Sequence, residues 1–241
     1  MRKLLYIVNI DWFFVSHRLP IALRAQKSGY EIHLITTFTD KFEYLSKFGF
    51  ILHDLKVDRK SKSIFTAFSY VLSISDLLRR INPDLIHLIT IKPLLLAGLT
   101  SRLLNFFGLI STKGIVTAIT GFGSVFAKDT ISSRIQGSLI LLFFKLTYIN
   151  AKKIKYIFQN KDDKEKLSKV LNINQNNSIY IKGSGVDLKK YTFSEFPKDK
   201  FNVLFASRLL RSKGLLDFID SSKYVSGAQF IIAGRYDPDS I

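Results

Sequence analysis

Cysteine is absent from this chain of 241 residues, which excludes a disulfide framework, a thiolate catalyst and a cysteine-based zinc site. Histidine is scarce, and the residues present are scattered without the spacing of metal ligands: His17, His33, His53 and His87. We therefore expect no metal site, although the carboxylates leave Mg²⁺ open. No apolar run reaches the roughly 20 residues that span a bilayer. The start, MRKLLYIVNI, has too short an apolar core for an export signal and reads as a first strand.

Acidic residues are also few, since 19 Asp and Glu stand against 36 Lys and Arg and give a net charge of +17. Nucleic acid, an anionic membrane and phosphorylated substrates are partners that suit such a charge. No nucleic-acid-binding motif is present, and the aromatic residues lie inside apolar runs, which argues against nucleic acid. Much of the charge forms a solvated surface, and the excess fits the cytoplasmic leaflet of a membrane.

Two apolar segments, 94–110 and 137–149, are interrupted by polar or charged residues such as Arg102 and Lys145. We expect both to form buried helices. The alternative is a shallow membrane contact by one of them, because cationic residues punctuate their apolar faces.

Short apolar runs alternate with helical patterns from the first residues onward, which predicts an α/β fold with a doubly wound parallel sheet. We expect strands at 4–9, 31–36, 51–55, 84–88, 114–119, 155–159, 202–206 and 230–233, the last two in a separate unit. The expected helices are 20–28, 42–48, 64–80, 93–107, 131–151, 162–170 and the run after Gly214, and a loop is expected at Asp11 to His17. The polar stretch 194–200 predicts a linker between a domain at 1–193 and the start of a second at 201–241.

Ligands of open parallel sheets bind beyond the carboxyl ends of the strands. After the first strand, Ser16 is expected to cap a helix, while His17 suits proton transfer or hydrogen bonding and Arg18 suits a phosphate. In the fourth strand, His87 is either a satisfied core residue or a ligand contact. Lys92 precedes a helix start, where a cation is unfavourable unless an anion offsets it.

Glycines mark two further loops. Gly121 and Gly123 in TGFGSVF allow close approach of the backbone to a ligand, but they do not form the dinucleotide-binding fingerprint. Gly183 and Gly185 flank Ser184 in a turn that either connects domains or forms an anion-binding nest.

The segment FNVLFASRLLRSKG, 201–214, places two cations between a strand and a helix. Val203 to Ala206 reads as a buried parallel strand, and Arg208 and Lys213 follow it. Two cations at such a junction suit a diphosphate.

Six segments together resemble the family-4 retaining glycosyltransferases, enzymes with the GT-B fold of two Rossmann-like domains that face each other across a cleft. These segments are 16–36, 87–98, 120–126, 158–163, 183–191 and 208–214. The first four are similar to a subgroup that builds bacterial O-antigen, capsule and related glycans. That resemblance implies transfer of an N-acetylhexosamine, or a related hexose, from a nucleotide-sugar to an undecaprenyl-diphosphate-linked acceptor.

The resemblance also implies roles for individual residues. Arg208 and Lys213 would grip the donor diphosphate, and His87 would lie near the reacting sugar. His17, Arg18 and Lys92 would lie on the acceptor side of the cleft, with the turn at Gly183 to Gly185 facing it. No cofactor is implied beyond the donor, a UDP-sugar, and the enzyme would be cytoplasmic and peripheral to the inner face of the membrane.

Family members continue for more than a hundred further residues. We therefore expect a second domain that is incomplete here and a chain that is inactive alone, with a separately encoded C-terminal half as its partner. Two alternatives remain open: a non-catalytic module that binds acceptor or membrane, and a GT-B enzyme that processes nucleotide-sugars without transferring them.

Overall fold

The chain divides into two compact units, Met1–Gly185 and Val186–Ile241. The computed structural model describes residues 1–55, 63–121, 131–148, 153–196 and 201–234. The predicted linker, 194–200, falls in the second unit, and its residues 197–200 lie outside the described ranges. The predicted domain boundary at residue 193 therefore stays a prediction.

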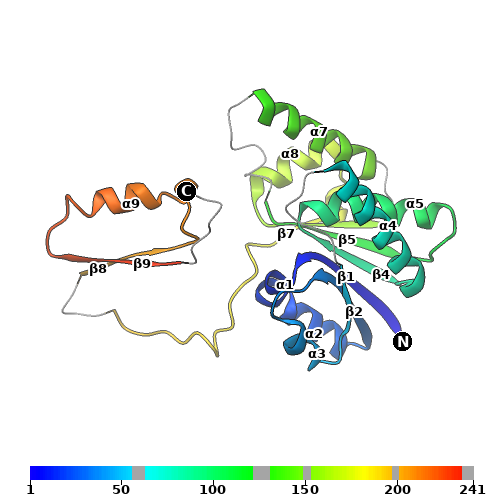
Figure 1. Cartoon of the computed structure of the whole chain (residues 1–241), viewed down its shortest axis with the longest axis horizontal. Coiled ribbons are helices and arrows are strands. Elements are labelled where there is room, and N and C mark those ends of the chain that lie inside the picture. The colour runs from blue at the N-terminus through cyan, green and yellow to red at the C-terminus, as the bar shows by residue number, and fades with distance from the viewer. Residues whose placement is uncertain (56–62, 122–130, 149–152, 197–200, 235–241) are drawn as a thin grey trace. The chain divides into compact units, whose positions relative to one another are not determined.

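The first unit is built on a seven-stranded parallel sheet with the order β3-β2-β1-β4-β5-β6-β7 (Figure 1). Its strands are β1 (Arg2–Ile10), β2 (Tyr30–Thr37), β3 (Ile51–Asp54), β4 (Leu85–Ile89), β5 (Gly114–Ile119), β6 (Ile154–Phe158) and β7 (Ser178–Tyr180). Leu5 to Val8 are all buried, as expected for a central parallel strand that is covered on both faces. The predicted fold class, α/β with a doubly wound parallel sheet, is confirmed.

Helices cover the two faces of this sheet in two groups, as Figure 1 shows. One group is α1 (Asp11–His17), α2 (Leu19–Lys27) and α3 (Phe42–Ser46). The other is α4 (Ile64–Ile81), the π-helix η1 (Pro93–Ala97), α5 (Gly98–Phe106), α7 (Ile131–Tyr148) and α8 (Lys161–Leu171), and a 3₁₀ turn, η2 (Gln175–Asn177), precedes β7. The strand order reverses between β1 and β4, which makes this point the topological switch of the sheet.

The segment expected to be a loop at Asp11 to His17 is instead the helix α1, which follows β1 directly. The Asp11 carboxylate accepts a hydrogen bond of 2.8 Å from the backbone N–H of Trp12, and Phe14 is fully buried against Tyr6. The predicted cap at Ser16 is wrong, because this residue lies in the last turn of α1 and its hydroxyl bonds the Trp12 carbonyl.

The expected helix at 93–107 begins with a π-helical turn, η1, before it continues as α5. The buried hydroxyl of Tyr148 donates a hydrogen bond to the carbonyl of Leu94 in this turn. Gly98 leaves the room for that hydroxyl, since a Cβ there would lie 2.2 Å from it.

The helix α7 is only half buried, which corrects the expectation that segment 137–149 is a buried helix. Its inner side places Phe144 and Tyr148 in the core, whereas Leu139, Leu142 and Leu146 are 59%, 53% and 64% exposed. Among the described residues, no helix has both the length and the apolar character to cross a membrane.

The second unit has the predicted β-α-β arrangement of β8 (Phe201–Ala206), a 3₁₀ turn η3 (Arg211–Lys213), α9 (Leu215–Ser221) and β9 (Ala228–Ala233). The two strands are parallel, and Phe218 of α9 contacts both Phe205 and Phe230. The expectation of a buried strand at 203–206 is wrong. Leu204 is 59% exposed, because α9 packs against the opposite side of the strand pair.

Candidate functional site

The candidate site lies at the carboxyl edge of the first unit's sheet, around the switch between β1 and β4. These two strands pair with Tyr6 opposite His87, and the rings of the two residues lie 5.1 Å apart. The helix pair α1 and α2 leaves the end of β1, and its junction holds Arg18. The fold thereby brings two of the predicted site residues, Arg18 and His87, close enough for the charge of Arg18 to act on the imidazole.

Arg18 is a buried cation, with only 3% of the residue exposed. Its Nη1 donates to the carbonyl of His17 at 2.9 Å and to the hydroxyl of Ser184 at 3.2 Å. Its Nε is buried and has no hydrogen-bond acceptor, and the described part of the chain offers Arg18 no carboxylate within ion-pair distance. Burial lowers the pKa of this guanidinium from its usual value. A buried charge without an acidic partner is costly to the fold, which makes Arg18 a candidate for binding an anion.

His87 is a buried, neutral imidazole at the same edge. Burial lowers its pKa to about 3, and the positive charge of Arg18 lowers it too. Its Nε2 has no hydrogen-bond partner in the described chain. Polar groups are rarely buried without a partner, so His87 does not fit the interpretation of a satisfied core histidine.

Ser184 and Gln159 belong to the same cluster, and the sequence did not single them out as site residues. The Ser184 hydroxyl accepts hydrogen bonds from Arg18 and, at 3.4 Å, from Nε2 of Gln159. Arg18 and Ser184 are 166 residues apart, so no local sequence pattern predicts their contact. The one signal in the sequence was the glycine turn that holds Ser184.

Asp11 fixes the start of α1 at this edge. The sequence analysis did not single it out as a site residue. Its buried carboxylate accepts hydrogen bonds from the backbone N–H groups of Thr39 and Lys41, at 2.7 and 3.0 Å, and from the Thr39 hydroxyl at 2.8 Å. Burial alone would raise its pKa, but these bonds outweigh that effect and hold the pKa below its ordinary value. The ionised carboxylate thus ties α1, and with it Arg18, to the loop after β2.

The other predicted residues of this edge make local contacts. Nδ1 of His17 lies 2.6 Å from the Ser16 hydroxyl, and its ring stacks on Phe13 at 4.1 Å. Burial lowers the pKa of His17. The amino group of Lys92 lies 5.4 Å from the ring centre of Tyr70 on α4, in a cation–π contact. None of these contacts brings Ser16, His17 or Lys92 to His87.

The predicted glycines lie in loops that suit the approach of a ligand. Gly183 and Gly185 have φ angles of 62° and 71°, and nothing lies within 4 Å of the Cβ that either would carry. Glycine adopts such angles more easily than residues that carry a Cβ, so both glycines favour the turn around Ser184. Gly121 follows β5, whereas Gly123 lies outside the described residues.

The predicted donor pair lies in the second unit. Arg208 follows β8, and Lys213 ends the 3₁₀ turn η3 just before Gly214 and α9. Both cations therefore lie in the connection between a parallel strand and a helix, as the sequence predicted.

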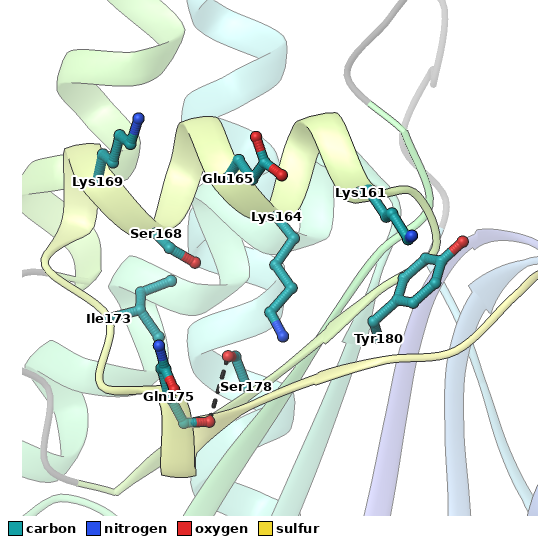
Figure 2. Close-up of a pocket in the computed structure, with 9 residues that line it drawn as sticks. All are labelled: Lys161, Lys164, Glu165, Ser168, Lys169, Ile173, Gln175, Ser178 and Tyr180. Atoms are coloured by element: carbon teal, nitrogen blue, oxygen red, sulfur yellow. Dashed lines mark hydrogen bonds between the residues drawn. The ribbon is translucent and has the colours of Figure 1, made fainter.

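A hollow of about 560 Å³ opens elsewhere in the first unit, between α8 and the edge strand β7. Figure 2 shows Lys164 reaching from α8 toward Ser178, with Lys161 and Tyr180 at one end of the groove. None of the predicted site residues lines it. In the described ranges, no group of His, Cys, Asp and Glu has an arrangement that could hold a metal ion.

The low pKa of His87 predicts that the first unit loses stability in acid. The unfolded chain binds a proton at this histidine below about pH 6.5, whereas the folded chain does so only near pH 3. The contribution of His87 to the free energy of unfolding should therefore be constant above pH 6.5 and fall by on the order of 5 kcal/mol between pH 6.5 and pH 3.

Urea unfolding followed by fluorescence of Trp12, the single tryptophan, measures this loss. His87→Asn should flatten the pH dependence. His53, whose pKa burial lowers to about 4, is the matched control, because His53→Asn should leave the contribution of His87 intact. Identical acid profiles for the wild type and His87→Asn would show that His87 is not held neutral.

Solved structures share this fold with low sequence identity. Sucrose-phosphate synthase from Thermosynechococcus elongatus has a TM-score of 0.69 and 16% identity over 100% of this chain and 64% of its own. A Listeria monocytogenes protein with the proposed activity of a UDP-N-acetylglucosamine 2-epimerase has a TM-score of 0.64 and 13% identity over 98% of this chain and 64% of its own. The Anabaena protein HepE, in complex with UDP and glucose, has a TM-score of 0.63 and 14% identity over 98% of this chain and 62% of its own.

The chain thus spans less than two thirds of these proteins, and the likeness identifies its fold as GT-B. No curated protein matches its sequence. The profile of one family, described as "Glycosyl transferase 4-like", matches residues 3–161, which is more than half of the chain. That match includes β1 to β6, Arg18 and His87. The chain therefore belongs to the glycosyl transferase 4-like family.

Proposed function

We propose that the protein is a retaining glycosyltransferase that moves an N-acetylhexosamine, or a related hexose, from a UDP-sugar to an undecaprenyl-diphosphate-linked glycan. Its product would serve a surface polysaccharide such as O-antigen or capsule. The family match and the UDP and glucose bound by the Anabaena neighbour support nucleotide-sugar chemistry. The observation that carries the proposal is the neighbouring placement of buried, cationic Arg18 and neutral His87 at the carboxyl edge of the sheet.

Arg208 and Lys213 bind the donor diphosphate in this proposal. Negative charge grows on the departing UDP as the sugar leaves, and two cations in a strand-to-helix connection stabilise it. Arginine contributes a planar fork of donors and lysine a compact charge. The reaction as proposed requires no cofactor besides the donor itself.

His87 contacts the reacting sugar. Its pKa of about 3 keeps the imidazole neutral at physiological pH. Sugar transfer passes through a transition state with positive charge on the ring, which a protonated histidine would oppose. A neutral imidazole can hydrogen-bond a sugar hydroxyl without that penalty.

The acceptor binds through Arg18, with Ser16, His17, Lys92 and the glycine loops after β5 and β7 as the surrounding surface. A lipid-linked acceptor carries a diphosphate, for which a buried guanidinium is a suitable partner. The Listeria neighbour favours a second candidate function, the epimerisation of a UDP-sugar, which needs no acceptor.

A transfer assay tests the proposal. Purified protein is incubated with UDP-N-acetylhexosamines and undecaprenyl-diphosphate-linked N-acetylhexosamine, and the lipid product is followed by mass spectrometry. We expect His87→Ala to lower kcat at least about 100-fold, because an interaction made in the transition state is lost. His53→Asn is the matched control and should retain activity.

The two candidates give different outcomes. Product that forms only with the acceptor supports transfer. Conversion of the UDP-sugar at equal rates with and without the acceptor would favour the second candidate. No reaction of any UDP-sugar, either with this chain or with a C-terminally extended form of it, would contradict the proposal. Retention is read from the anomeric configuration of the product.

We also place the protein at the cytoplasmic face of the membrane, where an undecaprenyl-linked acceptor is presented. Two helices on the same face of the sheet carry exposed apolar side chains, and both begin at its carboxyl edge. On α4, Phe65 and Phe68 are 87% and 63% exposed, and on α7 the exposed residues are Leu139, Leu142 and Leu146. The net charge of +17 complements an anionic leaflet.

Co-sedimentation with vesicles of phosphatidylglycerol and phosphatidylcholine tests this placement. Leu142→Glu should weaken binding about tenfold, because a leucine that enters the lipid interface contributes roughly 1.5–3 kcal/mol. High salt should weaken it as well. Leu103→Glu on α5 is the matched control, since Leu103 is 48% exposed and lies outside the two helix faces. Equal binding by both variants and the wild type would rule the surface out.

A further inference from the structure

The cluster around Arg18 is built to bind an anionic oxygen. The guanidinium is 3% exposed, has one buried Nε–H without an acceptor, and has no carboxylate partner in the described ranges. A phosphate stabilises a buried guanidinium far more than it stabilises a surface lysine. Little water surrounds the buried group, so its attraction to the anion is only weakly screened. Arginine also presents its donors in a plane that matches two oxygens of one phosphate.

Ser184 adds a donor whose direction the hydrogen bonds fix. A serine hydroxyl has two acceptor lone pairs and one proton. Both lone pairs are engaged, by Nη1 of Arg18 at 3.2 Å and by Nε2 of Gln159 at 3.4 Å, and these nitrogens only donate. The proton of Ser184 is therefore directed away from both groups and can be donated to an oxygen on the accessible side of the loop.

The surroundings leave groups and space free for a ligand. The buried Nε2 of His87 has no protein partner in the described ranges. Gly183 and Gly185 leave the space beside Ser184 open, since a Cβ at either position would have no neighbour within 4 Å. An oxyanion can thus approach the backbone at the same point as the hydroxyl.

We propose that Arg18 and Ser184 bind one phosphate of the acceptor diphosphate, and that Gln159 is a positioning residue that holds Ser184 in its donating orientation. This site rests on the proposed function for the identity of the acceptor. It is distinct from the donor pair, Arg208 and Lys213, which lies in the other unit. Both sites would bind a diphosphate, so the test must distinguish binding at one site from binding at the other.

Isothermal titration calorimetry with inorganic pyrophosphate and the full chain separates the two sites. Every protein tested carries Arg208→Gln and Lys213→Gln, which remove the donor site. In that background, Arg18→Gln should weaken pyrophosphate binding at least about 30-fold, and Ser184→Ala about 5- to 10-fold, because charge-assisted hydrogen bonds are lost. Lys161→Gln, at the groove beside β7, is the matched control for surface charge and should change nothing.

Ser184 is exposed, so Ser184→Ala should fold even if a variant of Arg18 does not. Gln159→Leu should weaken binding less than Ser184→Ala does, and Ser184→Thr, which keeps the hydroxyl, should restore most of the affinity. Equal pyrophosphate affinity in the background protein, Arg18→Gln and Ser184→Ala would overturn the proposal. Loss of binding in Lys161→Gln alone would place the anion in the groove and would overturn it too.

The same variants separate this inference from the proposed function. In the transfer assay, Ser184→Ala should raise KM for the lipid acceptor and leave KM for the UDP-sugar unchanged. If pyrophosphate binds as predicted but no sugar is transferred, the anion site stands and the proposed function fails. If sugar is transferred but Ser184→Ala alters only the donor KM, the anion site fails and the proposed function stands.

Discussion

The carboxyl edge of the first sheet depends on one electrostatic constraint, the burial of the Arg18 guanidinium without an acidic partner among the described residues. A buried charge of this kind costs several kcal/mol unless hydrogen bonds compensate for it. Here the carbonyl of His17 and the hydroxyl of Ser184 compensate only in part. Burial keeps the neighbouring imidazole of His87 neutral, and the positive charge of Arg18 adds to that effect.

The topology of the sheet brings these groups together. The strand order reverses between β1 and β4, so the connection after β1 leaves one face while the connection after β4 leaves the other. Tyr6 and His87 pair in register at this switch, and the Asp11 carboxylate fixes the start of α1. The loop after β7 then reaches Arg18 through Ser184. Residues from the two ends of the first unit therefore meet where an open α/β sheet binds its ligands.

The strands of this sheet can be predicted from the sequence, because buried parallel strands are continuous apolar runs. Arg18 and His87 stand out locally, as a cation at a helix start and a histidine in an apolar strand. The hydrogen bond between Arg18 and Ser184 cannot be predicted from local sequence, because it joins residues 166 positions apart. The helix α1 was missed since its signal is tertiary: Phe14 is buried against Tyr6, and Asp11 is bonded by a distant loop. Likewise, apolar spacing alone could not tell the outer face of α7 from its buried face, because both are rich in leucine and phenylalanine.

An anion bound at Arg18 should change the titration of the neighbouring His87, because the charge of Arg18 lowers the pKa of this imidazole. Nitrogen-15 NMR of the histidine rings measures this coupling, with the protein titrated in the absence and presence of saturating inorganic pyrophosphate. We expect the pKa of His87 to lie near 3 in the free protein and to rise with pyrophosphate, because the anion offsets the charge of Arg18. The rise should disappear in Arg18→Gln. A His87 that titrates near its ordinary value of 6.5, unaffected by pyrophosphate, would contradict the account.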